Sequence, residues 1–186
     1  MKKLVLRWIG FFVLFFVSIC VNAQGDNCSN ALVIANPASF CTSTSYSNAS
    51  ATPNSEGLSN STCWPSGTYQ DVWFTFTAVA TSLTVDVKTV DFNFYAPKVT
   101  VYEGTSCSSF IQNVCKSTSG ASASTVATLV KGKQYFIRVA TTSSNAGDFT
   151  LCIKNYTPVP PASADCSGAI KLCDKSSLSA VGFSGG

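Results

Sequence analysis

The 186-residue sequence predicts an all-β fold, an antiparallel β-sandwich of jelly-roll type with about eight strands, cross-linked by disulfides. Apolar and polar residues alternate along several short segments, and this alternation is typical of a half-buried β-strand. Glycine- and asparagine-containing turns separate these segments, and six cysteines are distributed among them. No ten-residue stretch after the N-terminal apolar run keeps a helical period, which disfavours α/β folds.

Alternation is clearest in the middle of the chain. In residues 82–88, Leu83, Val85 and Val87 alternate with polar residues, so one face of the strand is apolar. The other predicted strands are residues 31–35, a short strand near Tyr46, and residues 71–77, 98–102, 125–130, 134–139 and 148–153. Turns are predicted between them at Glu103-Gly104, Lys131-Gly132 and Asn145-Ala146-Gly147.

Residues 1–23 have the organisation of a signal peptide. A basic start at Lys2, Lys3 and Arg7 precedes an uncharged apolar run, and small residues at its end place the expected cleavage after Ala23. The run is shorter than the roughly 20 residues that a membrane-spanning helix needs, and no later stretch is long enough. The mature chain is therefore expected to have no transmembrane segment and to be secreted or displayed on the cell surface.

Removal of the signal peptide leaves the mature chain without net charge. The signal peptide carries three of the 12 basic residues and no acidic residue, so nine charges of each sign remain. Binding to nucleic acid requires an excess of basic residues, and the sequence therefore predicts no nucleic-acid partner. An extracellular glycan or a protein surface is the expected partner.

Six cysteines in an exported domain indicate three disulfides. Spacing alone permits about 15 connectivities. Topology favours one bridge across a short segment, one across the Ser/Asn-rich loop and one between the first and last strands. The expected pairs are Cys107–Cys115, Cys41–Cys63 and Cys28–Cys152. A structural zinc site is the alternative, but the sequence has no histidine and no Cys-x-x-Cys motif.

An opening motif occurs twice along the chain. Residues 26–34 read Asp-Asn-Cys-Ser-Asn-Ala-Leu-Val-Ile, and residues 165–172 read Asp-Cys-Ser-Gly-Ala-Ile-Lys-Leu. Between them, the proline-rich residues 157–164 favour an extended linker. Residues 24–156 are thus predicted to form one module, and residues 165–186 to begin a second that is too short to bury a core. We expect a piece of a longer multidomain protein; the alternative is a single secreted domain with a short tail.

Three motifs carry a resemblance to a known group of proteins. The opener at Asp26–Ala31 is followed by Asp-Val-Trp-Phe-Thr-Phe at residues 71–76, then by Val-Thr-Val-Tyr-Glu-Gly-Thr-Ser-Cys at residues 99–107 and Tyr-Phe-Ile-Arg-Val at residues 135–139. In this order they resemble the secreted, repeat-containing surface proteins of Bacteroidetes, many of them type IX secretion cargo and some linked to gliding or adhesion. The resemblance implies a β-sandwich similar to bacterial pre-peptidase C-terminal domains, outside the catalytic part of a larger protein.

No catalytic residue is predicted. The absence of histidine removes the usual general base and every histidine-dependent triad. Paired carboxylates could support glycoside hydrolysis, and the candidates by residue type are Asp71, Asp86, Asp91 and Glu103. Ordinary roles account for them, because Asp86 faces solvent on a predicted strand while Asp71 and Glu103 stand at strand ends. The module is therefore expected not to be an enzyme.

No cofactor and no metal site are predicted either. Calcium is the alternative, because Asp26, Asp91 and Glu103 could contribute the oxygen ligands that loops of β-sandwiches gather. No Asp-rich loop with EF-hand spacing is present, which favours solvated surface carboxylates.

Trp64, Tyr69 and Tyr95 are the candidate ligand-binding residues. They lie in or near predicted loops, where an exposed aromatic face can stack on a sugar ring. The alternative is that they fold inward and fill the core, as aromatic residues on strands do.

Together these patterns predict a non-enzymatic extracellular module of a larger secreted or cell-surface protein, serving adhesion, display or spacing. The alternative is an accessory, carbohydrate-binding domain of a secreted hydrolase whose catalytic domain lies outside this chain. Further sandwich repeats in the same protein would favour the first function, and a catalytic motif would favour the second.

Overall fold

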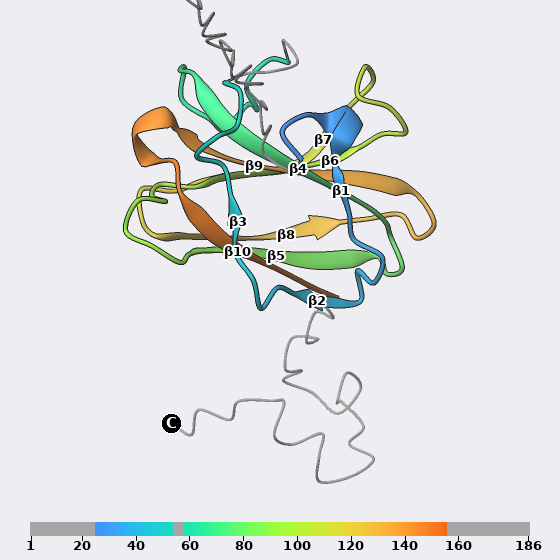
Figure 1. The fold of residues 1–186 in the computed structure, drawn as a ribbon. Helices are drawn as coiled ribbons and strands as arrows, with labels where there is room; N and C mark the ends of the chain where they lie inside the picture. Colours follow the sequence, from blue (N-terminus) through green and yellow to red (C-terminus); the bar gives the residue numbers. More distant parts are fainter. Residues whose placement is uncertain (1–24, 54–57, 156–186) are drawn as a thin grey trace, which may run out of the picture.

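Residues 25–53 and 58–155 are described by the computed structural model, and they form a sandwich of two five-stranded β-sheets (Figure 1). The predicted signal peptide, the proline-rich linker and the second module lie outside the described residues, so these three assignments stay predictions. Within the described part of the chain, no helix is long and apolar enough to cross a membrane.

The first sheet contains, in spatial order, β1 (Leu32–Val33), β4 (Tyr69–Thr77), β9 (Gln134–Thr142), β6 (Lys98–Glu103) and β7 (Ile111–Ser117). β1 runs parallel to β4, and the other neighbours are antiparallel. The second sheet contains β2 (Ser39–Cys41), β10 (Asp148–Asn155), β5 (Ser82–Thr89) and β8 (Ser122–Thr128), with β3 (Tyr46–Ser47) paired to the beginning of β10. Two short 3₁₀ segments are η1 (Cys28–Asn30) and η2 (Ser143–Asn145).

The predicted all-β sandwich is confirmed, although it has two strands, β2 and β7, that alternation does not predict. β7 lies at a sheet edge and packs against the inter-sheet core only through Val114, so it needs no continuous apolar face. β8 begins at Ser122 and not at the predicted Thr125, because the small residues Ala123 and Ala127 fill its inward positions.

The main core lies between the two sheets and follows the predicted alternation. Each long strand sends every second side chain inward, and successive side chains of a strand point to opposite faces. The inward residues of the four longest contributors are Val72, Phe74 and Phe76 of β4, Leu83, Val85 and Val87 of β5, Tyr135, Ile137 and Val139 of β9, and Phe149, Leu151 and Ile153 of β10.

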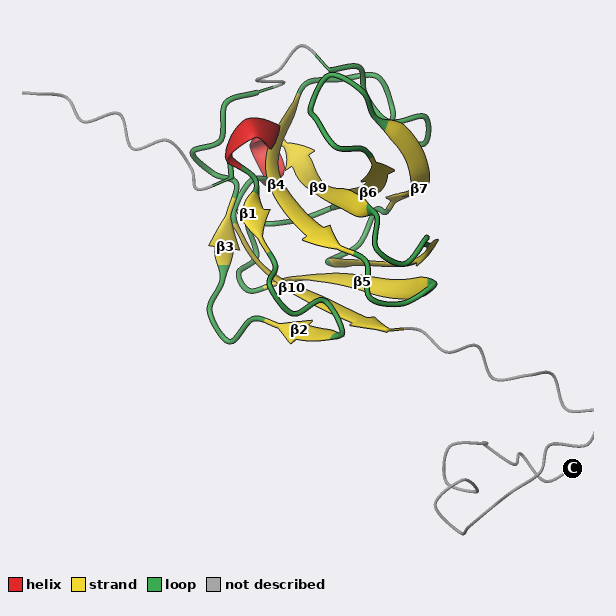
Figure 2. Ribbon diagram, turned by 90° about the vertical axis from the view of Figure 1, so that its right-hand side faces the viewer, coloured by secondary structure: helices red, strands yellow, loops and turns green. Residues whose placement is uncertain are grey.

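A second, smaller core covers the outer face of the first sheet. Trp73, Tyr102 and Phe136 point outward from β4, β6 and β9, and Phe110 and Cys28 pack on them from a loop and from η1. In Figure 2, η1 and the long loops lie on the side of the first sheet that faces away from β5 and β10. The loops on this face are therefore part of the folded interior.

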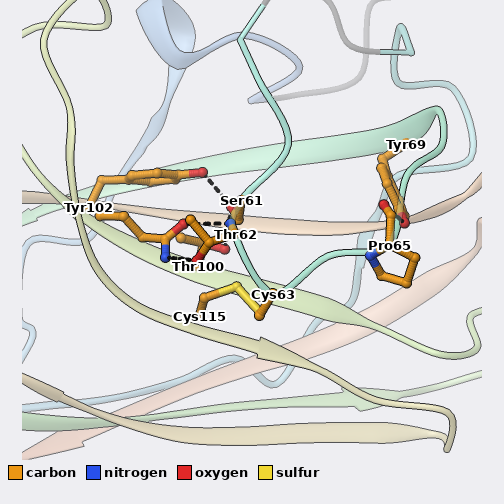
Figure 3. Close-up of a disulfide and its surroundings, with 9 residues drawn as sticks. Ser61, Thr62, Cys63, Pro65, Tyr69, Thr100, Tyr102 and Cys115 are labelled. Atoms are coloured by element: carbon orange, nitrogen blue, oxygen red, sulfur yellow. Dashed lines mark hydrogen bonds between the residues drawn. A yellow bond between two sulfur atoms is a disulfide. The ribbon is translucent and has the colours of Figure 1, made fainter.

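The described residues contain three disulfides, but each expected pairing is wrong. Cys28 is bonded to Cys107, Cys41 to Cys152 and Cys63 to Cys115, at sequence separations of 79, 111 and 52 residues. Figure 3 shows the Cys63–Cys115 bond. The reason is topological, since the sandwich brings distant segments together. Cys41 and Cys152 are direct partners across β2 and β10. The Cys28–Cys107 bond joins η1 to the β6–β7 connection, and the Cys63–Cys115 bond joins the loop before β4 to β7.

Non-reducing proteolysis followed by mass spectrometry should recover peptides linked through Cys28–Cys107, Cys41–Cys152 and Cys63–Cys115. The double variant Cys63→Ser/Cys115→Ser should lose about 2–4 kcal/mol of unfolding free energy, because the cross-link closes a long loop in the unfolded chain. Urea denaturation measures this loss. Recovery of a Cys107–Cys115 peptide would show that the observed topology of the covering loops is wrong.

Candidate functional site

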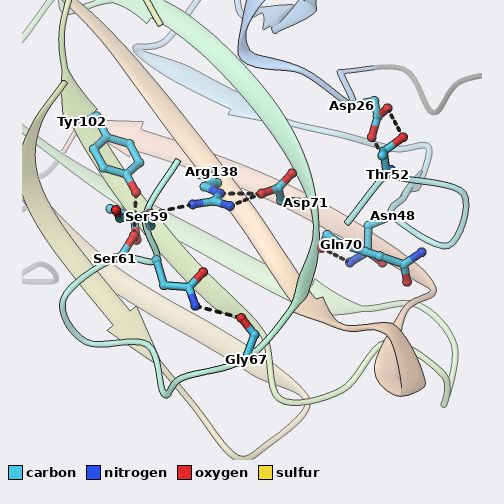
Figure 4. A network of polar contacts seen from close by, with 12 residues as sticks. Asp26, Asn48, Thr52, Ser59, Ser61, Gly67, Gln70, Asp71, Tyr102 and Arg138 are labelled. Atoms are coloured by element: carbon cyan, nitrogen blue, oxygen red, sulfur yellow. Dashed lines mark hydrogen bonds and ion pairs between the residues drawn. The ribbon is translucent and has the colours of Figure 1, made fainter. Parts of the chain in front are cut away.

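A buried ion pair lies at the centre of the covered face. The Arg138 Nε donates to Asp71 Oδ2 at 2.5 Å, and a second guanidinium nitrogen contacts the same oxygen (Figure 4). Both side chains are almost fully buried, and Arg138 also donates to the Ser59 carbonyl at 3.4 Å. The guanidinium carbon lies 4.7 Å from the Trp64 ring centre and 5.2 Å from that of Trp73. Cation–π contacts of this kind stabilise a desolvated arginine.

Burial dominates the ionisation of Asp71. It raises the pKa of the carboxyl to about 6, even though the charge and hydrogen bond of Arg138 favour the ionised form. The other glycosidase candidates lie elsewhere: Asp86 is on β5 of the second sheet, and Asp91 and Glu103 flank opposite ends of β6. Asp71 therefore belongs to a packed structural centre and does not face a substrate.

Several polar contacts attach the long loop before β4 to neighbouring strands of the first sheet. The Ser61 hydroxyl lies 2.6 Å from the Tyr102 hydroxyl and accepts from Thr100 at 2.7 Å (Figure 3). The Thr62 N–H donates to the Gln112 side-chain oxygen at 3.0 Å. With the Cys63–Cys115 bond, these contacts attach the loop to β6 and β7.

Two of the three predicted sugar-binding aromatics are buried beneath this loop. Trp64 is 6% exposed and Tyr69 is 2% exposed, and their ring centres lie 5.1 Å apart. The Tyr69 hydroxyl donates to the Pro65 carbonyl at 2.8 Å. Neither ring can offer a free face to a sugar, so the structure corrects these two assignments. Their position near loop segments does not reveal that the loop folds back onto the sheet.

Tyr95 is the predicted aromatic that remains accessible. It lies in the β5–β6 connection, residues 90–97, which we call the aromatic loop. Tyr95 is 47% exposed, Phe92 is fully exposed, and Val90 is also exposed. The structure thus adds Phe92 to the candidate site. Its loop position was visible in sequence, but loop position alone does not distinguish it from Phe94, which is buried.

Asp91 organises the aromatic loop. Its carboxylate accepts backbone N–H groups from Asn93 at 3.2 Å, Phe94 at 3.1 Å and Asp148 at 3.4 Å. The hydrogen bond from Phe94 is the main reason that the pKa of Asp91 is lowered. Phe94 packs beneath the loop on Phe149, with ring centres 4.8 Å apart. The exposed residues therefore project from an ordered base.

The far side of the aromatic loop is fixed as well. Ala96 has a left-handed backbone conformation, with φ of 52°, which is unfavourable for a residue with a Cβ. Its N–H donates to Gly120 at 2.9 Å, and the Lys98 ammonium donates to its carbonyl at 2.7 Å. Gly147 is needed beside the loop, because a Cβ there would lie 2.7 Å from the backbone nitrogen of Phe94. These contacts hold the strained residue in place.

The three calcium candidates do not form one site. Asp26 accepts from the Thr52 N–H at 2.5 Å and from the Thr52 hydroxyl at 2.9 Å. Asp91 binds the amides of its own loop, and Glu103 pairs with Lys133. Across residues 25–53 and 58–155, no three acidic or cysteine side chains are grouped to hold a metal ion. The expected absence of a cofactor stays a prediction.

Replacement of Asp71 by Ala should lower the unfolding free energy by about 3–5 kcal/mol, because it leaves the Arg138 charge buried and unpaired. Asp86→Ala is the control, since it removes a half-buried carboxylate of the second sheet and should change stability by less than about 1 kcal/mol. Urea denaturation of both variants measures the difference. Equal losses would contradict the central role of the ion pair.

Dialysis against a calcium chelator should leave the melting temperature unchanged within about 1 °C, since a protein that binds no calcium gains no stability from it. Differential scanning calorimetry with chelator and with millimolar calcium provides the comparison. A melting temperature that rises with calcium concentration would instead establish a calcium site.

These features define a disulfide-linked, all-β sandwich domain, with loops covering one face and exposed aromatic residues in an ordered loop. Residues 24–153 match the family model GBD_T9SS_assoc, described as galactose binding domain-like. The chain belongs to this family of domains associated with type IX secretion. The membership confirms the resemblance to type IX secretion modules of Bacteroidetes and, with the disulfides, indicates an exported protein.

Two solved structures have a distant similarity to this chain. The first is PliG of Aeromonas hydrophila, a periplasmic inhibitor of g-type lysozyme, with 10% identity and a TM-score of 0.40 over 67% of this chain and 96% of that one. The second is the K3 cleaved adhesin domain of Lys-gingipain from Porphyromonas gingivalis, with 14% identity and a TM-score of 0.33 over 50% of this chain and 66% of that one. No curated protein matches the chain.

Proposed function

We propose that this chain is a non-catalytic extracellular module that attaches its parent protein to an uncharged glycan, in an adhesive or accessory role. The observation that carries the proposal is the aromatic loop, which holds Phe92 and Tyr95 in solvent on a fixed base. Exposed apolar surface on a soluble protein is a common mark of a binding site.

The chemistry of the loop favours a sugar. The faces of aromatic rings are apolar and match the C–H faces of pyranose rings. Within residues 90–98, the two charged side chains, Asp91 and Lys98, are both held by hydrogen bonds to the backbone of this region. Hydrogen-bonding groups stand beside the rings, because the Tyr95 N–H donates to the carbonyl of Asn145 in η2, next to the exposed Ser143 and Ser144. The ligand should therefore be polar and uncharged.

Other observations support the coarser parts of the proposal. The family is galactose binding domain-like, and disulfides are typical of exported proteins. The chain has no histidine, and Asp71 is committed to a buried ion pair, which supports a non-catalytic role. If no glycan binds, display or spacing within a larger surface protein becomes the better function.

The double variant Phe92→Ala/Tyr95→Ala should bind neutral glycans roughly tenfold more weakly or worse, because two stacking contacts are lost. Pull-down on insoluble cellulose, chitin and starch, followed by titration with soluble oligosaccharides of galactose, glucose and mannose, measures the change. Val126→Ala is the matched control, since Val126 is 43% exposed on β8, close to the 47% of Tyr95. Binding that is unchanged in the double variant would reject the aromatic loop as the glycan site.

A further inference from the structure

A cleft of about 600 Å³ opens at the other end of the sandwich from the aromatic loop. β6 runs from Lys98, beside the aromatic loop, to Glu103, which lines the cleft, so the two lie roughly 17 Å apart along the strand. We call it the end cleft. Its walls come from the β6–β7 and β8–β9 connections and include Thr105, Ser109 and Lys133. Its volume falls within the range of small-molecule sites, about 300–1,000 Å³.

The floor of the end cleft carries a preorganised ion pair. Lys133 donates to one carboxylate oxygen of Glu103, and the Tyr135 hydroxyl donates to the other at 3.1 Å. Tyr135 is itself fixed in position, because its side chain is buried and its hydroxyl accepts a hydrogen bond from the Val130 N–H at 2.8 Å. The hydrogen bond from Lys133 is the main cause of the lowered pKa of Glu103, so the carboxylate is ionised at neutral pH.

The two charged groups remain accessible from the cleft. The side chain of Glu103 is 25% exposed and that of Lys133 is 52% exposed. A carboxylate has about four acceptor sites and an ammonium about three donors, so the mutual contact leaves positions free on both. The Glu103 carboxylate can therefore accept a hydrogen bond from one hydroxyl of a ligand, while the Lys133 ammonium donates one to a neighbouring hydroxyl.

The remaining lining selects the class of ligand. Glu103 and Lys133 cancel in charge, and the other polar lining groups, such as Thr105, Ser109 and Gln134, are uncharged. A charged ligand would compete with the internal ion pair, whereas a neutral one would not. Ile111 is the one large apolar residue of the lining, so a mainly apolar ligand would leave these polar groups without partners.

We propose that the end cleft is a second carbohydrate site, in which Glu103 accepts and Lys133 donates hydrogen bonds to neighbouring hydroxyls of an uncharged sugar. The inference rests on the proposed function in assuming a neutral glycan as the ligand. It extends that function, because two sites at opposite ends allow one module to bridge two glycan chains.

The test uses residues 24–186 in the Phe92→Ala/Tyr95→Ala background, which removes the contribution of the aromatic loop. Neutral oligosaccharides of galactose, glucose and mannose are titrated while ¹H–¹⁵N spectra are recorded, and galacturonic acid oligomers serve as the acidic comparison. The expected result is saturable shifts of the Gly104, Lys133 and Gln134 amides with a neutral sugar, and roughly tenfold weaker binding of the acidic oligomers.

Three variants then test the assigned groups. Glu103→Gln and Lys133→Met should each weaken binding by about tenfold or more, since each removes a charged hydrogen-bonding partner of the sugar. Thr105→Val leaves the ion pair intact and should weaken binding only a few-fold, about twofold to fivefold. Melting curves of the variants must stay cooperative. If an ion-pair variant unfolds, the loss of binding expected for Thr105→Val still tests the cleft.

The outcomes separate this inference from the proposed function. Absence of end-cleft shifts with every neutral sugar, or shifts with the acidic oligomers alone, would overturn the second site. Loss of pull-down on Phe92→Ala/Tyr95→Ala without end-cleft shifts leaves the aromatic loop as the single site. End-cleft shifts together with unchanged pull-down of that variant support the end cleft and reject the aromatic loop.

Discussion

The buried Asp71–Arg138 pair is the interaction on which the architecture of this module depends. An ion pair on the outer face of a sheet would be solvated in a simple two-layer sandwich. Here it is desolvated, and a desolvated pair is stable only with good geometry and further polar partners. The Ser59 carbonyl accepts a hydrogen bond from Arg138, and the rings of Trp64 and Trp73 add cation–π contacts with the guanidinium. The loop before β4 must therefore lie over the sheet.

This requirement explains where two of the disulfides lie. Cys63–Cys115 joins the covering loop to β7, and Cys28–Cys107 joins η1 to the β6–β7 connection. Both bonds lie on the covered face, where the clusters of buried residues are smaller than the core between the sheets. The third bond, Cys41–Cys152, joins two paired strands of the other sheet. Two of the three disulfides among the described residues thus attach the segments that cover this face.

Coverage of the outer face also limits which aromatic residues are exposed to solvent. Three aromatic residues of that face are buried and have no ring face open to solvent: Trp64, Tyr69 and Trp73. The two binding regions that we propose, the aromatic loop and the end cleft, lie at the two ends of the sandwich, where loops from different strand pairs meet. β6 connects these ends, since the aromatic loop precedes it and Glu103 completes it. Under the function that we propose, this arrangement places the two binding regions at opposite ends of one strand.

Local patterns determined the all-β fold, the central strands and the family resemblance, because alternation and turn residues act within a few positions of the chain. Only the tertiary structure decided the cysteine pairs, the burial of Trp64 and Tyr69, and the meeting of Glu103 with Lys133. Each of these depends on which distant segments the sheets bring side by side, and a segment's own composition does not encode its neighbours in space. Trp64 and Tyr95 look alike as loop aromatics in the sequence, and the position of a covering loop separates them.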